Sequence, residues 1–131
     1  DQYAAPSHVA LAAVASSGRW RDQLGPLLRR SPVAPAASYF RLLAAEAAVV
    51  DAWTTEYLHV LPPAEDGVHP VVAWTKGTAL TPFLAVLDDE AQQAFLADYS
   101  ARVTIAYPAL PDGRVLFGFR RVFFVASRAM R

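Results

Sequence analysis

The sequence contains no cysteine, and this absence excludes several classes of site. A disulfide framework, an iron–sulfur cluster, a thiolate zinc site and a cysteine nucleophile all need a side chain that the protein does not have. A chain without thiols fits a reducing compartment, and we expect a cytoplasmic location.

Glycine is sparse, and its six residues are scattered along the chain. No two of them lie close enough to form a phosphate loop or a dinucleotide-binding fingerprint. They are Gly18, Gly25, Gly67, Gly77, Gly113 and Gly118. The three histidines form neither an HExxH motif nor an i, i+4 pair, so we expect no metal site.

An excess of either charge is missing as well, because 12 acidic residues balance 12 basic ones. The neutral total offers no general attraction to nucleic acid or to an anionic membrane surface, so we expect neither as a partner. A membrane-spanning helix needs about 20 mostly apolar residues. The longest apolar stretches are interrupted by charge, one by Glu46 and Asp51 and another by Arg120 and Arg121.

The 131 residues are 54% hydrophobic, which is enough for the core of one domain. Ser7 precedes the apolar run 8–14 and predicts a helix with Ser7 as its N-cap and Gly18 near its end. Residues 19–34 predict a short helical piece within irregular chain. Residues 36–48 predict a second helix, because their apolar residues recur at helical spacing.

The pattern then changes to that of β-strands. Residues 49–61 and 114–127 are rich in β-branched and aromatic side chains, and each run predicts a strand. The stretch 62–110 between them predicts a helical insert, with Pro70 at a helix start and Asp88 capping a long helix. The order of elements therefore indicates an α/β fold.

Two strands alone make a marginal sheet, because an isolated ribbon is barely stable in water. Both predicted strands are apolar enough to be covered on both faces, as in an α/β sheet. We therefore expect the sheet to be incomplete in residues 1–131, which would form part of one domain.

Four segments in register carry a family resemblance. They read PSHV at 6–9, DAWTTEYLH at 51–59, WTKGTALTPFL at 74–84 and FRRVFFVA at 119–126. Together they resemble the C-terminal half of the trans-aconitate methyltransferase family, whose members are class I methyltransferases that use S-adenosylmethionine. The resemblance implies a Rossmann-like fold of which this chain holds the last two strands and a helical insert on the substrate side.

The resemblance also implies an activity, namely methyl transfer to a carboxylate of trans-aconitate or a similar small polycarboxylic acid. Carboxylates are ionised at pH 7, so no general base and no catalytic residue is expected in this chain. In the family the cofactor is held by a glycine-rich loop and an acidic residue of the N-terminal half. We therefore expect a fragment that has no cofactor-binding residue of its own and is inactive alone. Its expected partner is the N-terminal half as a second chain, or a swapped homodimer.

The candidate substrate site follows from the placement of strand ends. In open α/β sheets the ligand lies beyond the carboxyl ends of the parallel strands. The strand 49–61 brings His59 to that edge, and the helix that starts at Ser7 should open beside it. The candidate substrate-binding residues are His8, Tyr57, His59, Trp74, Lys76 and Arg121. Either histidine could instead have a structural role.

Other candidates also leave alternatives open. Arg121 matches an arginine of the family and lies among aromatic residues, so its guanidinium should be buried and should need a partner. That partner is either the substrate or a structural carboxylate such as Asp51. Lys76 either meets a substrate carboxylate or is solvated. Tyr57 and Trp74 either line the pocket or belong to the core.

A second function remains compatible with the sequence. The chain could be a non-catalytic helical module for ligand binding or pairing, without a cofactor site of its own. Such a module would be a monomer with a closed core.

Overall fold

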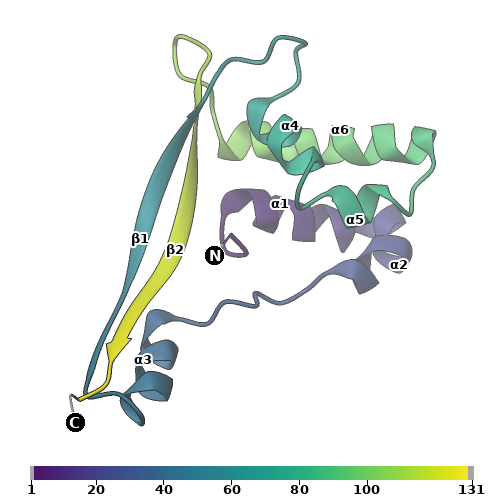
Figure 1. Cartoon of the computed structure of the whole chain (residues 1–131). Helices are drawn as coiled ribbons and strands as arrows, with labels where there is room; N and C mark the ends of the chain where they lie inside the picture. Colours follow the sequence, from purple (N-terminus) through teal and green to yellow (C-terminus); the bar gives the residue numbers. More distant parts are fainter. Residues whose placement is uncertain (1, 130–131) are drawn as a thin grey trace.

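A computed structural model describes residues 2–129 and shows a long two-stranded ribbon beside a layer of helices (Figure 1). The ribbon consists of β1 (Val49–Leu61) and β2 (Val115–Ser127). The strands are antiparallel, with Val49 opposite Ser127 and Leu61 opposite Val115. Both predicted strands are confirmed, and with the helices they confirm the α/β class.

Short helices make up the first third of the chain. The structure contains α1 (Pro6–Ala15), α2 (Arg21–Leu24) and α3 (Ala36–Ala44), with 3₁₀ turns at Gly18–Trp20 and Gly25–Leu27. These elements confirm the predicted helices and the irregular stretch between them.

The predicted N-cap of the first helix is wrong. The helix begins one residue earlier, at Pro6, and the residue in the cap position is Ala5. Proline suits the first helical position, because its fixed φ matches that of a helix. It has no N–H, and an N–H at this position would have no acceptor within the helix. Ser7 is instead buried in the first turn, where its backbone N–H donates to the Tyr107 hydroxyl at 3.0 Å. The helix also ends before Gly18, which starts a 3₁₀ turn.

Three helices lie between the strands in sequence, within residues 62–110. They are α4 (Pro70–Lys76), α5 (Thr81–Leu84) and α6 (Asp89–Ala106). Pro70 occupies the first turn of α4, as predicted. The Asp88 carboxylate accepts a hydrogen bond from the Ala91 N–H at 2.8 Å, which confirms the predicted cap of α6.

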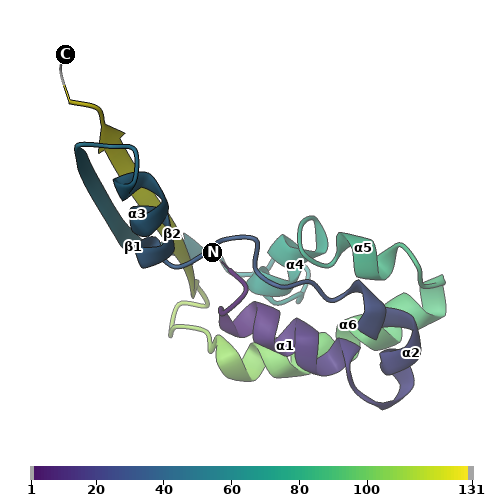
Figure 2. The same ribbon diagram turned by 90° about the horizontal axis from the view of Figure 1, so that it is seen from below.

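The core lies between the helices and the adjoining end of the ribbon. The helices α1 and α6 run side by side in both views (Figures 1 and 2). The α6 residues Phe95, Tyr99 and Val103 are four apart and all buried, so one helical face enters the core. Within the described range, no helix is both long and apolar enough to cross a membrane.

The ribbon itself is covered unevenly. Figure 2 shows it extending away from the helical layer, with α3 against its far end. There Tyr39 of α3 stacks on Phe124 with ring centroids 5.1 Å apart. On the opposite face, the near end packs against Trp74 of α4. Much of that face remains exposed toward the far end, including Trp53 at 44%.

Candidate functional site

A cavity of about 280 Å³ lies where the start of α1, the end of α4 and β2 meet. We call it the Ser7 cavity. It is lined by Gln2, Ser7, His8, Trp74, Thr75, Thr78, Ala79, Phe117 and Phe119. Residues far apart in sequence therefore converge on one small space.

Three residues around the cavity carry unsatisfied polar atoms. Within residues 2–129, the buried side-chain nitrogen and oxygen atoms without a hydrogen-bond partner are Gln2 Oε1, Ser7 Oγ and His8 Nδ1. All three residues line the Ser7 cavity. A buried polar group left unpaired costs about 1–3 kcal/mol, so this corner of the fold gathers polar groups that the described residues leave unsatisfied.

The other wall of the cavity is aromatic. The Trp74 ring lies 6.0 Å from Phe117 and 5.8 Å from Phe119, measured between centroids. The His59 ring contacts this wall, with its centroid 4.6 Å from that of Phe119 and 5.9 Å from that of Trp74. The structure thus brings together three of the predicted site residues: His8 and Trp74 line the cavity, and His59 supports its wall.

Among the described residues, His8 is the one titratable side chain in the lining. Burial lowers the pKa of His8 from its ordinary value of 6.5, because desolvation disfavours the charged ring. His8 is therefore neutral at pH 7. Its ring also lies 4.9 Å from that of Tyr3.

Arg121 and Tyr57 lie together, farther along the same face of the ribbon. The Arg121 guanidinium is 5.3 Å from the centre of the Tyr57 ring, a cation–π contact. Arg121 is exposed, so the expected buried guanidinium is wrong. The pairing with Asp51 is wrong too, because Arg121 lies opposite Thr55 and Asp51 lies opposite Val125.

Tyr57 lies between Arg121 and the cavity wall on this face of the ribbon. It lies directly opposite Phe119, which belongs to the cavity wall. Lys76 is not among the residues that line the cavity. It is the last residue of α4, and it is exposed. Its backbone carbonyl accepts a hydrogen bond from the Thr81 hydroxyl at 3.2 Å.

A second hollow of about 320 Å³ adjoins the cavity and contains a cation that the sequence analysis missed. We call it the Arg29 hollow. It shares His8, Thr78 and Ala79 with the Ser7 cavity and includes Arg29 in its lining. Arg29 lies in irregular chain after α2, where no periodic pattern distinguishes it.

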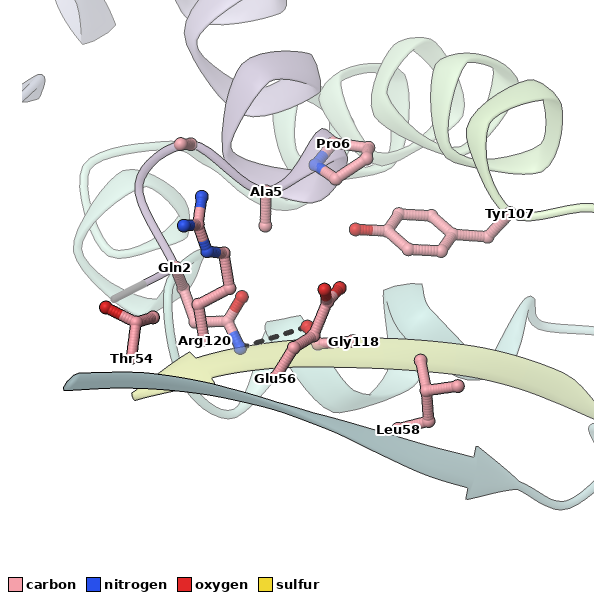
Figure 3. A pocket seen from close by; sticks show the side chains of 10 residues that line it. Gln2, Ala5, Pro6, Thr54, Glu56, Leu58, Tyr107, Gly118 and Arg120 are labelled. Carbon is pink, nitrogen blue, oxygen red and sulfur yellow. Dashed lines mark hydrogen bonds between the residues drawn. The ribbon is translucent and has the colours of Figure 1, made fainter. Parts of the chain in front are cut away.

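A third cavity, of about 530 Å³, lies on the other face of the ribbon (Figure 3). Glu56 and Arg120 are directly opposite each other in the two strands and point toward the N-terminal segment. Gln2 reaches this cavity as well, and its Nε2 donates to the Gly118 carbonyl at 3.3 Å. Strand alternation places Glu56 on this face, but nothing in the sequence marks what covers it.

The Ser7 cavity and the Arg29 hollow do not fit a nucleotide-like cofactor such as S-adenosylmethionine. Such a cofactor takes a glycine-rich loop and an acidic residue for its ribose. The linings of the Ser7 cavity and the Arg29 hollow contain no acidic residue within the described chain. No cluster of three or more metal-ligating side chains occurs among residues 2–129.

No family model matches the chain. Curated relatives do match it. It is 42% identical to the trans-aconitate 2-methyltransferase of Agrobacterium fabrum, over 98% of this chain and 49% of that protein. The corresponding protein of Rhizobium etli is 43% identical over 98% of this chain and 49% of its own length. That of Yersinia pestis is 42% identical over 96% and 48%. The chain spans about half the length of these relatives and matches their C-terminal half.

Proposed function

We infer from its homology to the C-terminal half of the trans-aconitate 2-methyltransferases that this chain is the substrate-side half of a methyltransferase. The observation that carries the proposal is 42% identity over 98% of the chain. The proposed donor is S-adenosylmethionine, bound by an N-terminal half. The proposed acceptor is a carboxylate of trans-aconitate or a similar small polycarboxylic acid.

The chain's own residues would bind and orient the acid. A carboxylate is already ionised at pH 7, so its oxygen can accept a methyl group without a base in this half. Rate then depends on holding that oxygen in line with the donor carbon. The proposed role of this half is therefore to bind and orient the acid, and it needs no residue that transfers a proton.

The proposed substrate site is the Ser7 cavity and its surroundings. His8 and Trp74 line the cavity, and the helical insert that we place at 62–110 supplies one of its walls. Arg29 and Arg121 are the neighbouring cations that could neutralise carboxylates, Arg29 from the adjoining hollow and Arg121 from beside Tyr57.

The proposed partner is an N-terminal half, present as a second chain or supplied by a swapped homodimer. It would cover the aromatic patch, by which we mean Trp53, Tyr57, Arg121, Phe123 and Val125 on one face of the ribbon. Trp53 stacks on Phe123 at 5.5 Å, yet Trp53 and Val125 remain exposed. Contiguous exposed apolar surface of this kind is typical of an interface.

A chimera tests the proposal. This chain would replace the C-terminal half of the Agrobacterium fabrum relative, and formation of a methyl ester from trans-aconitate would be followed by mass spectrometry. We expect ester only when S-adenosylmethionine is added, and none from this chain alone. Arg121→Ala should weaken the activity, with Arg128→Ala, beyond the end of β2, as the matched control. A folded chimera without activity would refute the proposal.

One observation supports a second candidate. The core around α1, α4 and α6 is closed within this chain, as a self-sufficient ligand-binding module would require. A monomeric chain that binds an acid while its chimera stays inactive would favour that function.

A further inference from the structure

Arg121 lies among the aromatic side chains of the aromatic patch, not at its border. On the same face of the ribbon, the next pair of residues in one direction is Trp53 and Phe123, and the next pair in the other direction is Tyr57 and Phe119. A surface that covers these aromatic rings therefore also covers Arg121 and removes water from its guanidinium.

The guanidinium of Arg121 has unused hydrogen-bond donors. Its recorded side-chain contact is with the Tyr57 ring, whose centre is 5.3 Å away. A cation–π contact occupies no N–H group. Within residues 2–129 the guanidinium makes no hydrogen bond and no ion pair. Its donors are therefore free to bind a carboxylate.

The two acidic residues of β1 do not supply that carboxylate. Asp51 lies on the same face but four residues before Thr55, the residue opposite Arg121. At about 3.3 Å per residue, this separation is about 13 Å along the strand. Glu56 lies on the other face, where its carboxylate points toward the N-terminal segment (Figure 3). The described residues thus leave Arg121 without a counter-charge.

The surroundings of Arg121 favour a protein partner over a small acid. Within the described chain, Arg121 lines neither the Ser7 cavity, nor the Arg29 hollow, nor the third cavity. Its face of the ribbon is open, with Trp53 44% exposed. A small acid bound there would stay in contact with water, where ion pairs are weak. A protein surface would exclude the water and strengthen the pair.

We propose that the N-terminal half covering the aromatic patch places an aspartate or glutamate side chain against Arg121. A carboxylate fits the fork of guanidinium N–H groups, whereas an unpaired guanidinium under an apolar cover is strongly unfavourable. We choose this occupant because the chain spans about half the length of its relatives and matches their C-terminal half. The inference rests on the proposed function: it leaves Arg29 to the acid substrate and assigns Arg121 to the interface.

Zero-length cross-linking of the chimera tests this contact. In Arg121→Lys, a water-soluble carbodiimide should join the introduced amine to the adjacent carboxylate as an amide, and the carbodiimide takes up the water that is lost. Digestion and mass spectrometry should then find a β2 peptide joined to an aspartate or glutamate of the N-terminal half. Arg120→Lys is the matched control. It lies one residue along β2 on the other face and should couple to Glu56, directly opposite.

Other products would overturn the assignment. A link from position 121 to a carboxylate of this chain, or of a second copy, would mean that the N-terminal half does not supply the counter-charge. A link to added trans-aconitate would place the substrate at Arg121. The absence of any link at position 121 would show that no carboxylate lies against it.

Kinetics of the chimera provide a second measurement. Arg121→Gln leaves the partner carboxylate unpaired, so the urea midpoint of the chimera should fall, while KM for trans-aconitate should change less than about twofold. Arg128→Gln, beyond the end of β2, is the matched control and should change neither. A rise in KM of about tenfold or more in Arg121→Gln would indicate a lost substrate contact and contradict the assignment.

This inference and the proposed function fail separately. A chimera that forms the ester without the expected cross-link refutes the inference and leaves the proposed function standing. A folded chimera that gives the cross-link but forms no ester confirms the interface and refutes the proposed function.

Discussion

Tyr107 connects three segments through its two polar groups. Its hydroxyl accepts the Ser7 N–H at 3.0 Å, and its carbonyl accepts the His69 Nε2–H at 2.8 Å. His69 Nδ1 in turn accepts the N–H of Val71 in the first turn of α4. One residue at the end of α6 therefore positions the starts of α1 and α4, the two helices whose residues line the Ser7 cavity.

We predict that Tyr107→Phe destabilises the protein by about 1–3 kcal/mol, because the buried Ser7 N–H loses its acceptor. Urea denaturation followed by circular dichroism measures the change. Tyr57→Phe is the control, since that side chain is exposed, and it should change the free energy of unfolding by less than about 0.5 kcal/mol. Equal effects of the two variants would mean that the Ser7 contact contributes nothing.

His8 makes stability depend on pH in a defined direction. Burial lowers its pKa in the folded chain below the ordinary 6.5, so the unfolded chain takes up a proton first as pH falls. The free energy of unfolding contributed by neutral His8 is thus complete above pH 6.5 and decreases as pH falls toward the folded pKa. In His8→Gln this part of the pH dependence should disappear. Denaturation at a series of pH values checks it, and an unchanged slope in the variant would contradict it.

Helix caps act at the scale of the element, and Asp88 allows a clean test on α6. Its carboxylate accepts the Ala91 N–H at 2.8 Å, whereas the neighbouring Asp89 contributes only charge to the first turn. Asp88→Ala should cost about 0.5–2 kcal/mol through the lost cap. Asp89→Ala should cost less than about 1 kcal/mol, the size of a charge–dipole effect. Thermal melts of the pair measure the difference, and a larger loss in Asp89→Ala would refute this assignment.

Elements that depend on local pattern could be predicted from the sequence. The strand β1 follows from its β-branched and aromatic run, and the starts of α4 and α6 follow from Pro70 and Asp88. The cap of α1 could not be predicted, because Pro6 already starts the helix and Ser7 is drawn into a contact with Tyr107, 100 residues away.

Burial and cavities depend on packing between distant elements. Phe117 and Trp53 lie on the same face of the ribbon, yet Phe117 is 2% exposed and Trp53 is 44% exposed. The alternation of side chains along a strand predicts that both lie on this face. It does not predict that α4 covers only the end of the ribbon that contains Phe117. Gln2 and Arg29 join the site from irregular segments, where no periodicity indicates a role.

At the scale of the whole molecule, the ribbon has more surface than this chain covers. Two strands of 13 residues each form the sheet described here, and one face carries the aromatic patch. Exposed strand edges favour pairing with another chain. Exposed aromatic residues beside them add apolar area that association would bury.

We therefore predict that the chain alone self-associates through the aromatic patch. Sedimentation equilibrium should show a species heavier than the monomer, and Trp53→Thr should shift it toward monomer, since threonine keeps strand propensity while removing apolar area. Ile105→Thr is the matched control: Ile105 is 84% exposed but lies on α6 and is not part of the aromatic patch, so its loss should not change the mass. An N-terminal half should compete with self-association, because both would cover the same patch. A wild-type chain that stays monomeric at all concentrations would show that the patch drives no pairing, and would favour the self-sufficient binding module.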